Sequence, residues 1–124
     1  MPAARAIVLK RAYEDPGPED GYRVLVDRLW PRGRARAVLA LDAWARDLAP
    51  SDALRKTFHH DAERWGAFRE AYLQELGQPA QRAAMQALLS AAGAGRLTLV
   101  YGARDPERNN AVVLQQALSA LTRP

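Results

Sequence analysis

The sequence contains no cysteine, and this absence removes several kinds of chemistry at once. Disulfides, thiolate nucleophiles and cysteine-ligated zinc are all excluded. Lysine is scarce as well: only Lys10 and Lys56 occur among 18 basic residues, so nearly all the positive charge is arginine. No long apolar segment opens the chain, and no apolar run elsewhere in the sequence is long enough to cross a bilayer. We therefore expect a protein with no membrane partner, in the reducing environment of the cytoplasm.

Several well-known site motifs are also missing. The sequence has no Walker A loop and no Gly-x-Gly-x-x-Gly turn, and it has no Gly-x-Ser-x-Gly elbow around a serine. The two histidines, His59 and His60, stand next to Asp61, and three consecutive residues rarely converge on one ion. The sequence therefore predicts neither a metal site nor a cofactor.

What is present fits one globular domain over residues 1–124. Hydrophobic residues make up 48% of the 124 positions and charged residues 26%, a composition that supports a single core. The net charge of +4 favours anionic partners. Arginine suits that task, because its planar fork matches phosphate and carboxylate groups with two hydrogen bonds.

Two apolar runs end in charged residues, and they organise the rest of the prediction. Residues 24–26 pass directly into Asp27 and Arg28, and residues 97–101 pass into a turn that carries Arg104. Continuous apolar runs are typical of strands covered on both faces, as in a parallel sheet. Ligands of open α/β sheets bind beyond the carboxyl ends of such strands. We therefore expect Arg28, Arg104 and Arg32, which follows the first run, to line one crevice.

The remaining elements complete an α/β pattern. A first strand is expected at 6–9 and a polar loop at 14–21, and periodic apolar residues predict helices at 42–48, 52–58, 61–76, 79–92 and 105–121. Ser51 is expected to cap the second helix, and Asp105 to cap the last, with Pro106 in its first turn. This order predicts a small three-layer domain with a short, mostly parallel sheet flanked by helices.

At this point the chain resembles a known family. The run RVLVDRLWPRG at 23–33 and the later motifs resemble the YeaO-like family, domain of unknown function 488; these motifs include Trp44, His60-Asp61, Arg64-Trp65, Tyr72, Thr98–Tyr101, Asp105 and Asn109. The resemblance implies a compact, single-domain bacterial α/β protein. Arg104 and the segment 34–36 stand where lysine is common in the family, and both changes keep the positive charge.

The candidate ligand-binding residues each have a structural alternative. Arg28, Arg32 and Arg104 form an anion clamp, or they form ion pairs with Asp27 and Asp105 that tie the strand ends together. Trp30, beside these arginines, stacks on a ligand or shields the ion pairs. Asn109 and Asn110 reach a ligand, or they hydrogen-bond only to the backbone.

Candidate catalytic residues lie in the same region of the sequence. His60 acts as a general acid or base beside Asp61, or it merely precedes a helix cap. Asp27, Asp105 and Tyr101 would lie near it at the crevice. These residues predict an enzyme or sensor for a phosphate- or carboxylate-bearing small molecule, including a nucleotide. The alternatives are a nucleic-acid-binding module that uses the arginines at 32–36, and a homo-oligomeric or accessory protein.

Overall fold

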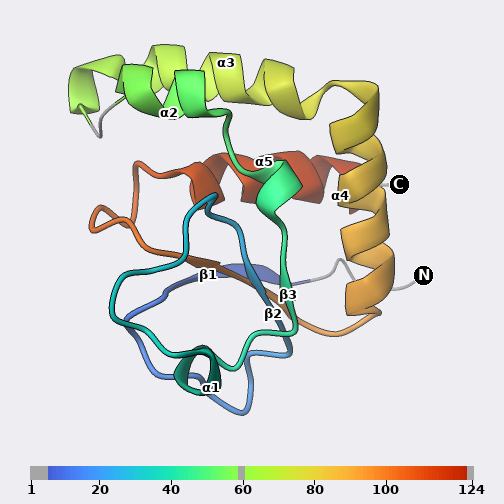
Figure 1. Cartoon of the computed structure of the whole chain (residues 1–124). Coiled ribbons are helices and arrows are strands. Elements are labelled where there is room, and N and C mark those ends of the chain that lie inside the picture. Colours follow the sequence, from blue (N-terminus) through green and yellow to red (C-terminus); the bar gives the residue numbers. More distant parts are fainter. Residues whose placement is uncertain (1–5, 59–60, 123–124) are drawn as a thin grey trace.

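A four-stranded parallel sheet in the order β1-β4-β2-β3 lies at the centre of the computed structural model, which describes residues 6–58 and 61–122 (Figure 1). The strands are β1 (Ile7–Arg11), β2 (Tyr22–Leu25), β3 (Ala43–Trp44) and β4 (Leu97–Tyr101). The helices are α1 (Arg36–Leu39), α2 (Asp52–Phe58), α3 (Trp65–Leu76), α4 (Pro79–Ala92) and α5 (Asn110–Thr122), with short 3-10 turns η1 (Arg46–Leu48) and η2 (Ala62–Arg64). The predicted α/β class with a parallel sheet is confirmed.

The inner strand β4 is buried along its whole length, and its side chains point into two cores on opposite faces of the sheet. Leu97, Leu99 and Tyr101 face the larger core, which α2 to α5 cover. Val100 faces a smaller core under α1, where it meets Leu25 and Leu39. Figure 1 shows α1 alone on this side of the sheet and the longer helices on the other. No helix among the described residues is long and apolar enough to cross a bilayer.

One predicted helix is wrong. Residues 42–48 form the edge strand β3 and the turn η1, because β2 takes the backbone of this segment into the sheet. The Asp42 amide donates to the Arg23 carbonyl and the Ala45 amide to the Leu25 carbonyl, both at 2.8 Å. Sheet pairing therefore overrides the helical spacing of the apolar residues. The helix α1, within a segment expected to be a loop, was not predicted either.

The start of the last helix also differs from the prediction. Asp105 does cap a turn, because its carboxylate accepts the Glu107 amide at 2.9 Å, but that turn does not continue into the helix. The helix α5 begins at Asn110, and Asn109 supplies its cap by accepting the Val112 amide at 3.1 Å. The cap predicted at Ser51 is confirmed, since its hydroxyl accepts the Leu54 amide at 3.2 Å.

A buried ion pair holds α1 to the sheet. Asp20 and Arg23 are only 5% and 4% exposed, and the Arg23 Nη1 donates to Asp20 Oδ2 at 2.6 Å. The same guanidinium donates to the Leu39 carbonyl at 3.0 and 2.8 Å, which anchors the last turn of the four-residue helix. Burial alone would raise the pKa of Asp20, but the Gly17 amide, Lys10 and Arg23 together hold its pKa below the usual value.

The substitution Asp20→Asn tests this anchor. Removing one partner of a buried pair leaves the other charge uncompensated, so we expect a loss of about 3 kcal/mol in the free energy of unfolding at pH 7, measured by urea denaturation. The folded pKa of Asp20 is depressed, so its contribution is present above the unfolded pKa of about 3.9 and is lost as the pH falls through the folded value. The difference between wild type and variant should therefore shrink on acidification below pH 4. Glu19→Gln, at an exposed neighbour, is the matched control.

Candidate anion-binding site

A cavity of about 260 Å³ opens at the carboxyl ends of β2 and β4, on the face of the sheet that carries the longer helices. Its polar lining comes from Asp27, Arg28, Arg55 and Asn110. Its apolar lining comes from Leu29, Pro50, Phe58 and Phe68, and the turn after β4 closes it with Gly102 and Ala103. This is the edge at which parallel sheets bind ligands.

Asp27 ties together the three elements that meet at the cavity. Its Oδ2 accepts the Gly102 amide at 2.8 Å, and its Oδ1 accepts the Asn110 Nδ2 at 3.1 Å. The Asn110 Nδ2 also donates to the Val26 carbonyl at 2.9 Å, so one amide group bridges β2 and α5. A Cβ at Gly102 would lie 3.2 Å from Asp27 Oδ2, so a larger residue there would crowd this carboxylate. Asp27 thus fixes the shape of the cavity.

Two guanidinium groups at the cavity share one carboxylate. The Arg28 Nε donates to the Pro50 carbonyl at 3.2 Å and lies 3.7 Å from Asp52 Oδ1. The Arg55 Nη2 donates to the same oxygen at 3.1 Å. Hydrogen bonding from Arg55, opposed by desolvation and aided by the charge of Arg28, lowers the pKa of Asp52. Asp52 is therefore shared by two guanidiniums, while the other carboxylate of the cavity, Asp27, accepts the Gly102 amide and the Asn110 side chain.

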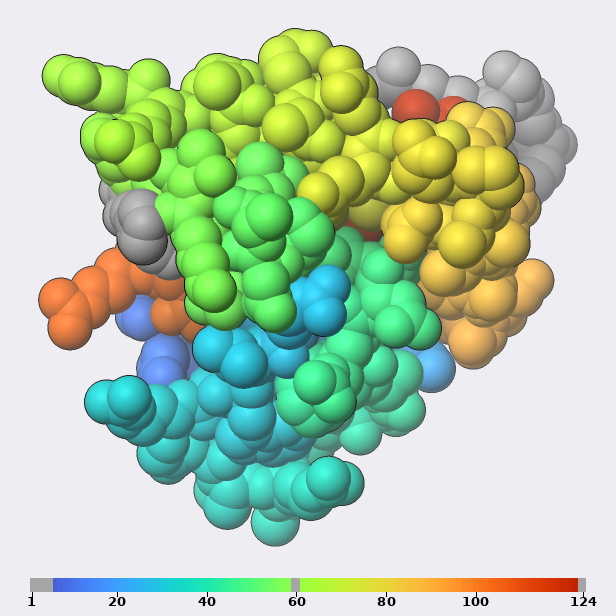
Figure 2. Space-filling model, turned by 45° about the horizontal axis from the view of Figure 1, so that its top comes forward, coloured from blue at the N-terminus to red at the C-terminus, as the bar shows by residue number. Residues whose placement is uncertain are grey.

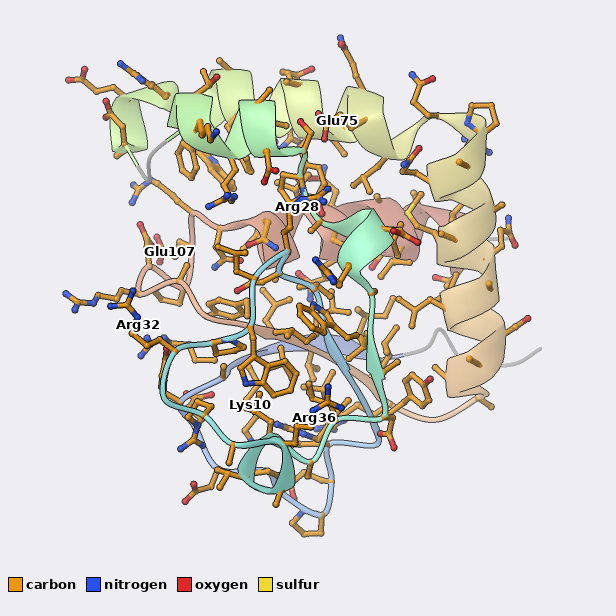
Figure 3. All side chains as sticks on the ribbon, in the orientation of Figure 1. Lys10, Arg28, Arg32, Arg36, Glu75 and Glu107 are labelled. Carbon is orange, nitrogen blue, oxygen red and sulfur yellow. The ribbon has the colours of Figure 1, made fainter. Side chains whose placement is uncertain are left out.

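The figures agree with this placement. Figure 2 shows the residues that follow β2, in blue, directly against α2, in green. Figure 3 shows Arg28 extending from the end of β2 toward α2 and α3, in the direction of Glu75. The Glu75 carboxylate accepts the Ser51 amide at 3.0 Å and the Ser51 hydroxyl at 2.6 Å, so it is committed to the start of α2.

The turn after β4 contributes backbone groups to the wall of the cavity. The Arg11 guanidinium takes the carbonyls of this turn, with its Nε donating to Ala103 at 2.9 Å and its Nη2 to Gly102 at 3.4 Å. The amides of Ala103 and Arg104 have no hydrogen-bond acceptor in the described part of the chain. The N-terminus of α5 lies at the same cavity through Asn110, and a helix N-terminus favours anions.

Other predicted ligand-binding residues lie elsewhere. Arg32 and Arg104 are exposed and are not among the residues that line the cavity. Figure 3 shows Arg32 well apart from Arg28. Trp30 packs edge to face on Trp44 with ring centres 5.3 Å apart, against the smaller core. Asn109 is fully buried in its role as helix cap.

Two of the residues predicted to be catalytic, Tyr101 and Asp105, have shifted pKa values. Burial, with the charges of Glu14 and Asp105, raises the pKa of the Tyr101 phenol. Hydrogen bonding from the Glu107 amide lowers the pKa of Asp105, and Arg108 lowers it further. Neither residue lines the cavity. His60 lies outside the described residues.

The cavity therefore combines Asp27, Arg28 and Asn110, all named as candidate residues from the sequence, with residues that the sequence did not single out. Arg55 lies in α2, where the periodic pattern marks only Leu54 and Phe58, so no sequence signal sets it apart. Phe58 and Phe68 fit the pattern of core residues, and both are buried, but they also line the cavity. No group of three acidic or histidine side chains able to hold a metal ion occurs within 6–58 and 61–122.

Comparison with known proteins gives consistent matches over most of the chain. A family model described as "Inactive DUF488-N3 subclade" matches residues 6–123. The Escherichia coli protein named "Uncharacterized protein YeaO" is 44% identical over 115 residues, which is 93% of this chain and 98% of the relative. "Uncharacterized protein Mb3100c" of Mycobacterium bovis and "Uncharacterized protein Rv3073c" of Mycobacterium tuberculosis are each 40% identical over 109 residues, 88% of this chain and 90% of theirs. No solved structure matches.

The bridge formed by Asn110 can be tested by Asn110→Ala. The substitution removes the donor to the Val26 carbonyl and to the Asp27 carboxylate, so we expect a loss of about 1 to 2 kcal/mol in the free energy of unfolding. It should also speed hydrogen exchange at the Gly102 amide, because Asp27 loses a partner that orients it. Gln116→Ala, at an exposed position of the same helix, should change neither measurement. Unchanged exchange in Asn110→Ala would show that Asp27 is held without the bridge.

Proposed function

The chain belongs to the YeaO-like DUF488 family, and from this premise we propose that it binds a small anionic molecule, one that carries a phosphate or carboxylate group, in the cavity at the ends of β2 and β4. The observation that carries the proposal is the pair of arginines at this cavity. Arg28 and Arg55 both pair with Asp52, whose side chain is largely exposed to water. The other carboxylate of the cavity, Asp27, already accepts the Gly102 amide and the Asn110 side chain. An anionic guest would compete with the exposed Asp52 for the two guanidiniums.

The surroundings of the two arginines support the same proposal. A carbonyl group holds Arg28 in place, so a guest would meet a guanidinium that is already oriented. The turn after β4 and the N-terminus of α5 line the other side of the cavity, and a helix N-terminus favours anions. The side chains of Arg28 and Arg55 are 32% and 42% exposed, so a guest can reach both from solvent.

We propose binding without chemical turnover. The matching family model is described as inactive, and this description favours a protein that recognises its ligand and leaves it unchanged. The groups near the strand ends are consistent with that proposal. Tyr101 and Asp105, two of the residues predicted to be catalytic, do not line the cavity, so a ligand bound there would not meet them.

Binding of nucleic acid is the second candidate, and it has weaker support. Of the arginines in 32–36, Arg34 donates to the Ala12 carbonyl at 2.9 Å, and Arg36 stacks over the Trp30 ring at 5.6 Å. The fold therefore already uses two of the three side chains on which this function depends. Nucleic-acid binding stays a prediction, which retardation of labelled single strands at low salt would test.

Substitution of the two arginines tests the proposed anion site. Inorganic phosphate and pyrophosphate should bind the wild type in isothermal titration calorimetry, and Arg28→Ala or Arg55→Ala should each weaken binding by about tenfold or more, since a hydrogen bond to a charged group contributes about 1.5 to 3 kcal/mol. Arg82→Ala removes the same charge from an exposed position on α4 and is the matched control.

The control separates a specific site from general electrostatic attraction. Equal weakening in all three variants would mean that net charge, rather than this cavity, attracts the anion. Absence of binding by the wild type at millimolar phosphate would refute the proposal. Release of nitrophenol from p-nitrophenyl phosphate, beyond that seen with Arg28→Ala, would refute the statement that the ligand is left unchanged.

A further inference from the structure

The cavity that holds the two arginines has a second half of different chemistry. Phe58 and Phe68 stack on each other with ring centres 4.4 Å apart and planes inclined by 22°, and both contribute to the cavity wall. Pro50 lies in the same wall and joins it to the arginine side, because its carbonyl accepts from Arg28. An apolar wall thus lies beside the cationic one, although Phe58 and Phe68 are only 4% and 5% exposed.

Leu29 extends this apolar surface into solvent. It follows Arg28 in sequence, lines the same cavity and is 59% exposed, the largest exposure among the large apolar side chains that the described residues place at the surface. A bound apolar group that covered Leu29 would recover the free energy of burying it.

The size of the cavity narrows the class of guest. A volume of about 260 Å³ exceeds what a single tetrahedral oxyanion fills, and it lies just below the range of roughly 300 to 1,000 Å³ that is common for small-molecule sites. Water left in the apolar half would find few hydrogen-bond partners there. The cavity therefore fits one ring with an attached anionic group better than it fits an inorganic ion or a dinucleotide.

We propose that the ligand of this cavity is an aromatic monophosphate or aromatic carboxylate, with its anionic group on Arg28 and Arg55 and its ring against Phe58, Phe68 and Leu29. This inference rests on the proposed anion-binding function and names the class of molecule that the same site selects. The ring and the anionic group are adjacent in the ligand because the two halves of the cavity meet at Pro50.

Three probes of matched chemistry test the inference. Methyl phosphate carries the anionic group alone, benzyl alcohol carries the ring alone, and phenyl phosphate carries both. We expect phenyl phosphate to bind at least about tenfold more tightly than methyl phosphate in titration calorimetry, and to give intermolecular nuclear Overhauser effects between its ring protons and the ring of Phe68.

A variant outside the core keeps the test independent of folding. Leu29→Ala should weaken phenyl phosphate binding by about threefold and leave methyl phosphate binding unchanged, because Leu29 contacts only the ring. Val38→Ala shortens a side chain that is 43% exposed on α1, away from the cavity, and should change neither affinity. Both positions are exposed, so neither variant is expected to unfold the chain.

The outcomes separate this inference from the function on which it rests. If methyl and phenyl phosphate bind equally and both depend on Arg28, the preference for a ring is refuted and the anion site remains. If neither phosphate binds, both proposals fail. If benzyl alcohol binds as tightly as phenyl phosphate and Arg28→Ala changes nothing, the apolar half binds ligands without the arginines, which refutes both the anion site and the paired recognition proposed here.

Discussion

The site depends on the hydrogen bonds that the Asp27 carboxylate accepts. It accepts the amide of Gly102 and the side-chain amide of Asn110, so the ends of β2 and β4 and the start of α5 are fixed relative to one another. The Asp27 carbonyl accepts the Trp44 Nε1 at 2.7 Å, which brings the edge strand β3 into the same arrangement. A carboxylate can serve several donors at once, because its two oxygens offer about four acceptor sites. This one residue therefore holds three of the segments that line the cavity, and α2 and α3 complete its wall with Arg55, Phe58 and Phe68.

Arginine has two separate tasks in this molecule, and composition alone does not distinguish them. Arg11, Arg23 and Arg34 each donate to backbone carbonyls at the ends of strands or helices, where the regular pattern of hydrogen bonds stops. The planar fork, with five donors, suits this task as well as it suits anion binding. Arg28 and Arg55 differ, because they reach a cavity and share one exposed carboxylate. The high arginine content therefore supports the fold first and supplies a candidate site in one place.

The site was predicted in part because strand ends follow from local sequence. The apolar run before Asp27 and Arg28 marks the point at which a parallel strand leaves the sheet, and the structure has these two residues at the cavity. Arg32 and Arg104 follow the same strands, but a turn of the chain separates each of them from its strand. The local sequence does not predict the direction of that turn, so it does not predict where these two side chains lie. Arg55 lies in α2, and only folding brings this helix next to the end of β2. The two segments meet at Asp52, which pairs with both Arg28 and Arg55.

By itself, the sequence determined the α/β class, the presence of strands near 6–9, 24–26 and 97–101, and the helices α2, α3 and α4, because period and capping residues act within a few positions of the chain. Only the tertiary structure decided that residues 43–44 pair as a strand, because their hydrogen-bond partners lie in β2, about twenty positions earlier. It also decided which arginines reach the cavity and which lie elsewhere. That distinction depends on the acceptors that folding brings near each guanidinium, and those acceptors come from distant parts of the chain.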